Sequence, residues 1–91
     1  MSCIRFIRTT HHNGIHRLFS AEALQFWREY GATVGEVLRP ETPLTLTEIV
    51  TACQEYVLEF PQFTLYPILN EQHIAWCLIK LIEYGMVGVV V

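Results

Sequence analysis

The chain has 91 residues, of which 52% are hydrophobic, and a formal net charge of −3. This length supports one domain, residues 1–91, with a single core. A short chain with so many hydrophobic residues is expected to leave some apolar side chains exposed to solvent. Exposed apolar patches often mark surfaces for partner binding or self-association. Its apolar runs fall short of the about 18 residues of a membrane span, so no membrane partner is expected.

The charges are unevenly distributed along the chain. Residues 1–17 carry Arg5, Arg8 and Arg17 and no acid, whereas all nine glutamates lie in residues 18–91. Proteins that clamp duplex DNA present a clustered basic surface, and only the N-terminal end offers one here. These three arginines are therefore candidate contacts to phosphate or to an acidic partner; the alternative is a solvated sheet face.

The three cysteines, Cys3, Cys53 and Cys77, are an odd number and form no Cys-x-x-Cys pair. No secretory signal precedes them, so we expect reduced thiols and a cytoplasmic location. Cys53 and Cys77 fall on apolar helix faces, where packing in the core is the expected role.

Residues 3–19 predict a β-hairpin. Asn13-Gly14 favours the type I′ turn, and short runs of alternating apolar residues lie on either side of it. Ser20 then predicts the cap of a first helix whose apolar side holds Ala23, Phe26, Trp27 and Tyr30 and which ends at Gly31. A short helix over residues 33–38 and a stiff connector over residues 39–43, with two prolines, follow.

Thr45 and Glu48 form a capping box, with Leu44 and Ile49 as its hydrophobic staple. They predict a helix that runs to Phe60, where Pro61 prevents continuation. Its inner stripe is formed by Ile49, Ala52, Cys53, Tyr56 and Phe60. The apolar connector over residues 62–69 fits either a short helix or a strand.

Asn70 predicts the cap of a last helix, which Gly85 ends. Its inner face holds Ile74, Cys77, Leu78, Leu81 and Ile82. Residues 87–91 favour a strand, which needs a partner for its backbone groups: the N-terminal hairpin or a second copy of the chain. The outer face of the helix carries Gln72, Trp76, Ile79, Lys80 and Glu83.

Three helices followed by Glu83-Tyr84-Gly85-Met86-Val87 resemble the winged-helix pattern, in which a last helix enters a wing strand at a glycine. The resemblance covers residues 20–91 and implies an α+β, helix-dominated, winged-helix-like domain. Two features depart from it: the connector before the last helix is long, and only one wing strand follows. A hairpin before three helices, with residues 47–61 followed by residues 78–89, is also similar in layout to the small peptide chaperones of pyrroloquinoline-quinone biosynthesis. That resemblance implies binding of a peptide at a sheet edge, and the linker around Pro40 and Pro43 departs from it.

The residue types favour binding over catalysis. The chain has no aspartate, no glycine-rich phosphate loop and no nucleophile elbow, so we expect no enzyme, no catalytic residues and no cofactor. His11, His12 and His16 surround the predicted turn without a complete ligand set, so no metal site is expected.

The outer face of the last helix is the candidate partner-binding site. Trp76 and Ile79 are the expected apolar anchors, and Gln72, Lys80 and Glu83 are the expected polar rim. The other role open to Trp76 is to cover the core against the hairpin. We predict a small regulatory or adaptor domain that binds another protein and forms a homodimer. The alternatives are a winged-helix DNA-binding regulator and a peptide chaperone that binds by β-augmentation.

Overall fold

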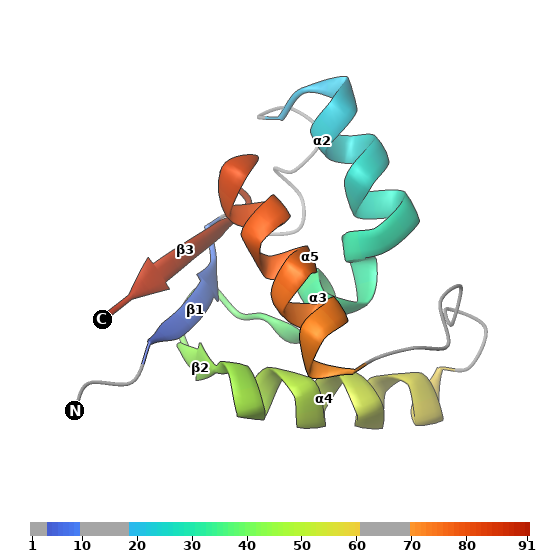
Figure 1. Cartoon of the computed structure of the whole chain (residues 1–91), viewed down its shortest axis with the longest axis vertical. Coiled ribbons are helices and arrows are strands. Elements are labelled where there is room, and N and C mark those ends of the chain that lie inside the picture. Colours follow the sequence, from blue (N-terminus) through green and yellow to red (C-terminus); the bar gives the residue numbers. More distant parts are fainter. Residues whose placement is uncertain (1–3, 10–18, 61–69) are drawn as a thin grey trace.

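The computed structural model describes residues 4–9, 19–60 and 70–91. Helices and a small antiparallel sheet contribute to one core (Figure 1), so the predicted α+β, helix-dominated class is confirmed. The elements in chain order are β1 (Arg5–Arg8), α2 (Ala21–Phe26), η2 (Trp27–Gly31), α3 (Ala32–Val37), β2 (Leu44–Thr45), α4 (Leu46–Glu59), α5 (Glu71–Glu83) and β3 (Val87–Val90).

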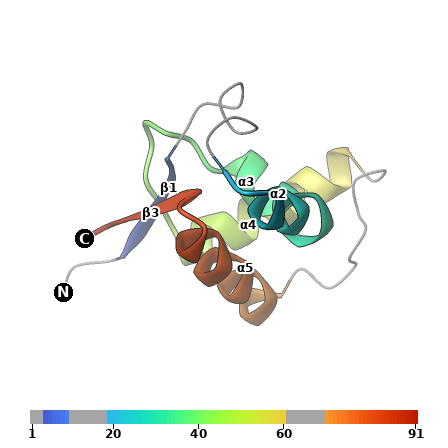
Figure 2. The same cartoon turned by 90° about the horizontal axis from the view of Figure 1, so that it is seen from above.

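The sheet joins the two ends of the described chain. Its strand order is β2-β1-β3, and both pairs are antiparallel. Arg5 lies opposite Val90 and Arg8 lies opposite Val87, so the C-terminal strand pairs with the N-terminal one, which is the first of the two partners that the sequence left open. Figure 2 shows β1 and β3 side by side.

The predicted N-terminal hairpin is only partly covered by the structure. Its strand β1 is present, whereas the turn at Asn13-Gly14 and the second strand lie outside the described residues. In the described part of the chain, the two neighbours of β1 are β2 and β3. Strand β2 was not predicted: Leu44 and Thr45 served only as staple and cap in the sequence, yet they also pair with Phe6 and Arg5.

The first helix begins as predicted but does not end where predicted. The Ser20 hydroxyl accepts the Ala23 N–H at 3.1 Å and caps α2. The chain then continues through the π-helical turn η2 into α3, so the prediction that Gly31 ends the helix is wrong. Gly31 has φ −94° and ψ −11°, a right-handed conformation, and a Cβ there would lie 3.0 Å from Leu81 Cδ2. Gly31 is therefore not needed for a left-handed conformation, and the nearest neighbour of an added side chain would be a methyl group of Leu81.

The predicted caps of the two long helices are confirmed. Thr45 and Glu48 exchange both hydrogen bonds of the capping box, at 2.9 and 3.3 Å. Asn70 accepts the His73 N–H at 2.8 Å. The chain leaves α5 at Gly85, whose φ of +81° suits a residue without a Cβ.

The core lies where the sheet and the helices meet. On α5 four of the five predicted inner residues, Ile74, Cys77, Leu78 and Leu81, are at most 2% exposed, and the fifth, Ile82, is half-buried. On α4 only two residues of the predicted stripe, Ile49 and Cys53, are fully buried, and the other three are half-buried. Among the described residues, no helix is long and apolar enough to cross a membrane.

Candidate interaction surface

A cluster of aromatic side chains fills the contact between η2 and α5. The Trp76 ring meets the Phe26 ring at 64° and the Tyr30 ring at 85°, both with centroids 5.4 Å apart. The Phe26 ring also contacts Tyr84, at 5.6 Å. Edge-to-face pairs of this kind add about 1 kcal/mol each beyond the area that they bury. The rings are therefore held in fixed positions by one another.

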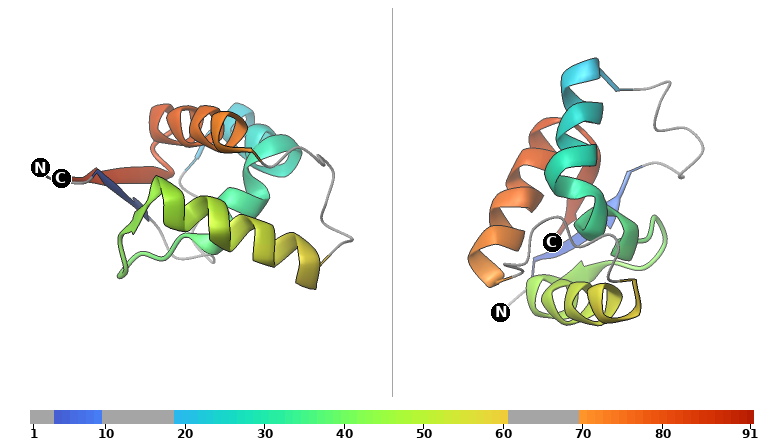
Figure 3. Two further views of the ribbon diagram at one scale, coloured as in Figure 1. Left: turned by 60° about the horizontal axis from the view of Figure 1, so that its bottom comes forward. Right: turned by 90° about the vertical axis from the view of Figure 1, so that its right-hand side faces the viewer.

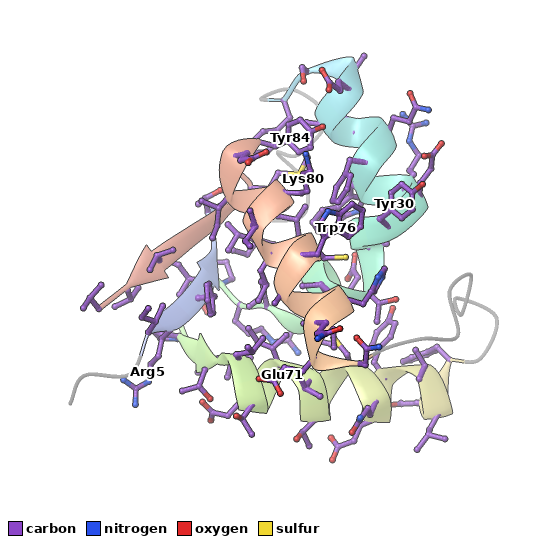
Figure 4. The ribbon with its side chains drawn as sticks, viewed as in Figure 1. Arg5, Tyr30, Glu71, Trp76, Lys80 and Tyr84 are labelled. Carbon is purple, nitrogen blue, oxygen red and sulfur yellow. The ribbon has the colours of Figure 1, made fainter. Side chains whose placement is uncertain are left out.

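This cluster reaches the surface. Phe26 lies beneath the other rings and is 8% exposed, whereas Tyr30 is 36% and Trp76 is 39% exposed. Ile79, one turn after Trp76 on α5, is 56% exposed. We call the set Tyr30, Trp76, Ile79 and Tyr84 the aromatic surface; Figure 4 shows Tyr30, Trp76 and Tyr84 along the line where the two helices meet.

Local sequence explains how these rings are positioned. Phe26, the last residue of α2, and Trp27, the first residue of η2, are buried, whereas Tyr30, three residues further along η2, lies at the surface. Tyr84 is the C-cap of α5, and its hydroxyl donates to Glu22 Oε1 at 3.2 Å. This hydrogen bond ties the end of α5 to the start of α2, at one end of the aromatic surface.

The structure places the predicted partner-binding residues on the outside of α5. Gln72, Trp76, Ile79 and Glu83 are exposed, and Lys80 is half-buried. Trp76 packs against Phe26 and Tyr30, so it is a partly covered surface residue rather than a core residue. Tyr30 belongs to the apolar side predicted for the first helix, and it contacts Phe26 as that prediction implies, but it stays partly exposed. Sequence reasoning did not include Tyr30 or Tyr84 in the candidate site. The spacing of Tyr84, eight residues after Trp76, was the signal that it shares that helix face.

The charges near the aromatic surface are mainly negative. Helices α2, η2 and α5 carry four glutamates against Arg28 and Lys80. Lys80 Nζ lies 3.7 Å from Glu83 Oε2, and an exposed pair of this kind contributes under about 1 kcal/mol to stability. Partial burial, and then the charge of Glu22, raise the pKa of the Tyr84 hydroxyl above its usual value.

The predicted basic site is not assembled in the described part of the chain. Arg5 is exposed at the sheet, away from the aromatic surface (Figure 4), and Arg17 lies outside the described residues. Arg8 is only 9% exposed, so its prediction as a contact to phosphate or to an acidic partner is corrected. The strand alternation directs it inward, where its Nη1 donates to the Gly35 carbonyl at 3.5 Å and its Nε has no partner among the described residues.

A cysteine and a histidine lie together on α5, but the thiol is not activated. Cys77 Sγ is 3.7 Å from His73 Nε2 and 3.6 Å from the Tyr30 carbonyl oxygen. Burial raises the pKa of Cys77 to about 11 and that of Cys53 to about 12. A nucleophilic cysteine needs a lowered pKa, so this arrangement favours a packed thiol over a catalytic one.

No group of three or more metal-binding side chains occurs in residues 4–9, 19–60 and 70–91. The three histidines around the predicted turn lie outside these ranges. Comparisons of the chain with protein-family models, with curated proteins and with solved structures found no match.

Proposed function

We propose that this chain is a non-enzymatic protein-binding domain, regulatory or adaptor in role, that docks a partner on the aromatic surface. One observation carries the proposal: the Tyr30 and Trp76 rings are fixed by edge-to-face packing yet remain 36% and 39% exposed. Fixed aromatic rings lose little conformational entropy when a partner covers them, which is why such residues dominate binding energy at interfaces.

The charges define the chemistry of the partner. The helices that carry the aromatic surface have an excess of glutamates, so a basic segment is favoured and an acidic one is repelled. An arginine side chain can stack on an indole or phenol face and reach a carboxylate at the same time. The expected ligand is therefore a segment of another protein that presents arginine next to apolar side chains.

The same charges weigh against a DNA-binding role of the winged-helix type. The only lysine is on α5 and lies beside Glu83, and Arg8 is buried. A helix that enters the major groove needs basic neighbours to hold the phosphates. The free thiols of Cys53 and Cys77 agree with a cytoplasmic site of action, which we include in the proposal.

A peptide titration followed by NMR tests the proposal. The probe is a short synthetic peptide of alternating arginine and leucine, and its counterpart alternates glutamate and leucine. We expect the arginine peptide to shift the indole N–H signal of Trp76 and to leave that of the buried Trp27 in place. Trp76→Ala should weaken binding at least ~10-fold.

Leu58→Ala is the matched control, because Leu58 is an 83% exposed apolar residue on α4, away from the aromatic surface. It should bind as the unchanged chain does. Equal binding of both peptides, or equal loss in Trp76→Ala and Leu58→Ala, would contradict the proposal. Circular dichroism spectra of each variant check that the helices remain.

A further inference from the structure

One edge of strand β3 is unpaired in the described part of the chain. The strand pairs with β1 along its other edge. Val87, at the start of the strand, is 3% exposed, whereas Val89 is 46% and Val90 is 38% exposed, and Val91 after the strand is 84% exposed. Its outer backbone N–H and C=O groups can therefore accept another strand.

This edge lacks three of the features that block strand addition, namely charges, prolines and bulges. Residues 87–91 read Val-Gly-Val-Val-Val, without a charge or a proline. The register with β1 is continuous from Arg5–Val90 to Arg8–Val87, so no bulge twists the edge away. Natural edge strands are commonly protected by such charges, prolines or bulges, and this one is not.

The outer end of the sheet also leaves apolar side chains uncovered. Phe6 and Val87 lie on the face that packs on the core, and strand alternation places Ile4, Val89 and Val91 on the same face. Ile4 is 55% and Val89 is 46% exposed, so the helices stop covering this face before the strands end. The left view of Figure 3 shows β1 and β3 extending beyond the helices.

We propose that a second copy of this chain covers this edge, with β3 pairing antiparallel to β3 of its partner about a twofold axis. The two sheets then join into one, and each contact is made twice. A register centred on Val89 places Val91 of one copy opposite Val87 of the other. The uncovered end of each strand then lies beside the buried end of its partner, which is why a second copy fits better than an unrelated peptide.

The charges near the edge permit this pairing. Arg5 is the exposed charge on the neighbouring strand, and two copies of it would be separated by three strand spacings, about 14 Å. That distance exceeds the Debye length of about 8 Å at physiological salt, so their repulsion is largely screened. The strand is short, so the interface lies at the small end of specific contacts and the dimer depends on protein concentration.

Charge substitutions at position 89 test the twofold pairing. Val89→Lys and Val89→Glu each place like charges opposite each other, so each variant alone should dissociate at least ~10-fold more readily than the unchanged chain. An equal mixture of the two variants should restore the dimer, because lysine then faces glutamate. Analytical ultracentrifugation over a range of concentrations measures both effects.

Two controls separate this inference from the proposed function, which uses a different surface. Leu58→Lys adds the same charge on α4 and should leave the dimer unchanged. Trp76→Ala should also leave it unchanged. A dimer that survives Val89→Lys, or one that Trp76→Ala removes, would overturn the β3 pairing. The pairing would also be overturned if the unchanged chain stayed monomeric and the NMR signals of its β3 amides shifted on addition of an extended valine-threonine peptide. That result would support peptide binding at this edge instead.

Discussion

The indole ring of Trp27 lies so close to Gly35 that a Cβ atom at position 35 would be 1.9 Å from the ring atom Cη2. Trp27 is itself 8% exposed and packed in the core, so it has little room to withdraw. We expect Gly35→Ala to destabilise the chain by about 2 kcal/mol through overpacking, despite the better helix propensity of alanine. Urea denaturation followed by Trp fluorescence measures this loss.

Gly31→Ala is the matched control for that prediction, since Gly31 belongs to the same helical run. A Cβ at position 31 would have as its nearest neighbour a terminal methyl of the Leu81 side chain, 3.0 Å away rather than 1.9 Å. A small shift of Leu81 relieves that contact, so we expect a change of under about 1 kcal/mol. Equal effects at the two glycines would show that the Trp27 contact does not determine the choice of glycine at position 35.

The cap of α4 should make stability depend on acid pH. The pKa of Glu48 lies below its ordinary value of 4.5, mainly because its carboxylate accepts the Thr45 backbone N–H, with smaller help from the Thr45 hydroxyl and Arg5. A lowered folded-state pKa stabilises the fold above 4.5, and this contribution is lost as pH falls through the folded-state value.

Glu48→Gln isolates this effect, because glutamine keeps the accepting oxygen and removes the titration. The melting temperature of the unchanged chain should exceed that of Glu48→Gln at pH 7, and the two should converge toward pH 3. A difference that stays constant over this range would show that the carboxylate charge plays no part in the cap.

The two buried thiols should resist modification in the folded chain. Cys53 and Cys77 are 0% exposed, and burial raises both pKa values well above 9.0. In a Cys3→Ser background, Ellman's reagent at pH 8 should react with the folded chain only as fast as the fold opens. In denaturant it should react rapidly with two thiols per chain. Fast labelling of a folded sample would contradict the packed, protonated state.

The same pKa shifts predict a loss of stability in alkali. A raised folded-state pKa means that the unfolded chain loses the thiol protons first, so stability is complete below pH 9 and falls as pH rises toward 11. In the Cys3→Ser background, the additional double substitution Cys53→Ala/Cys77→Ala should show a shallower fall between pH 9 and pH 10.5. Urea midpoints at each pH measure it, and parallel profiles would exclude the thiols as the cause.

Arg8 carries a buried charge without a carboxylate partner in the described residues. All nine glutamates of the chain belong to those residues, and the sequence has no aspartate. Replacing such a charge by an apolar side chain of similar length removes its desolvation cost but leaves the Gly35 carbonyl unpaired. We expect Arg8→Met to raise the free energy of unfolding by about 1 kcal/mol, since the desolvation cost is the larger effect.

Arg5→Met serves as the reference for Arg8→Met, because Arg5 is an exposed arginine on the same strand. Its free energy of unfolding should change by under about 0.5 kcal/mol. A clear loss of stability in Arg8→Met would show that the hydrogen bond to Gly35, at the negative end of α3, outweighs the cost of burying the charge.

The features that could be predicted from the sequence, chiefly the starts of the two long helices, depend on residues that lie within one helical turn of each other in the sequence. Thr45 and Glu48 lie three positions apart, and Asn70 caps the helix that follows it, so both helix starts were evident. The strand at Leu44 and the continuation through Gly31 depend on Phe6 and Leu81, which are distant in sequence. For the candidate site, the outer face of α5 followed from helix periodicity, whereas its contact with Tyr30 required the packing of two helices.

The pairing of β1 with β3 has a consequence for synthesis of the chain. Arg8 and Val87 are partners in the sheet, yet roughly eighty residues separate them. During translation β1 leaves the ribosome before β3, so β1 cannot pair with β3 until β3 has also left the ribosome. The helices can form before then, but the sheet on which they pack is complete only after translation has passed residue 90.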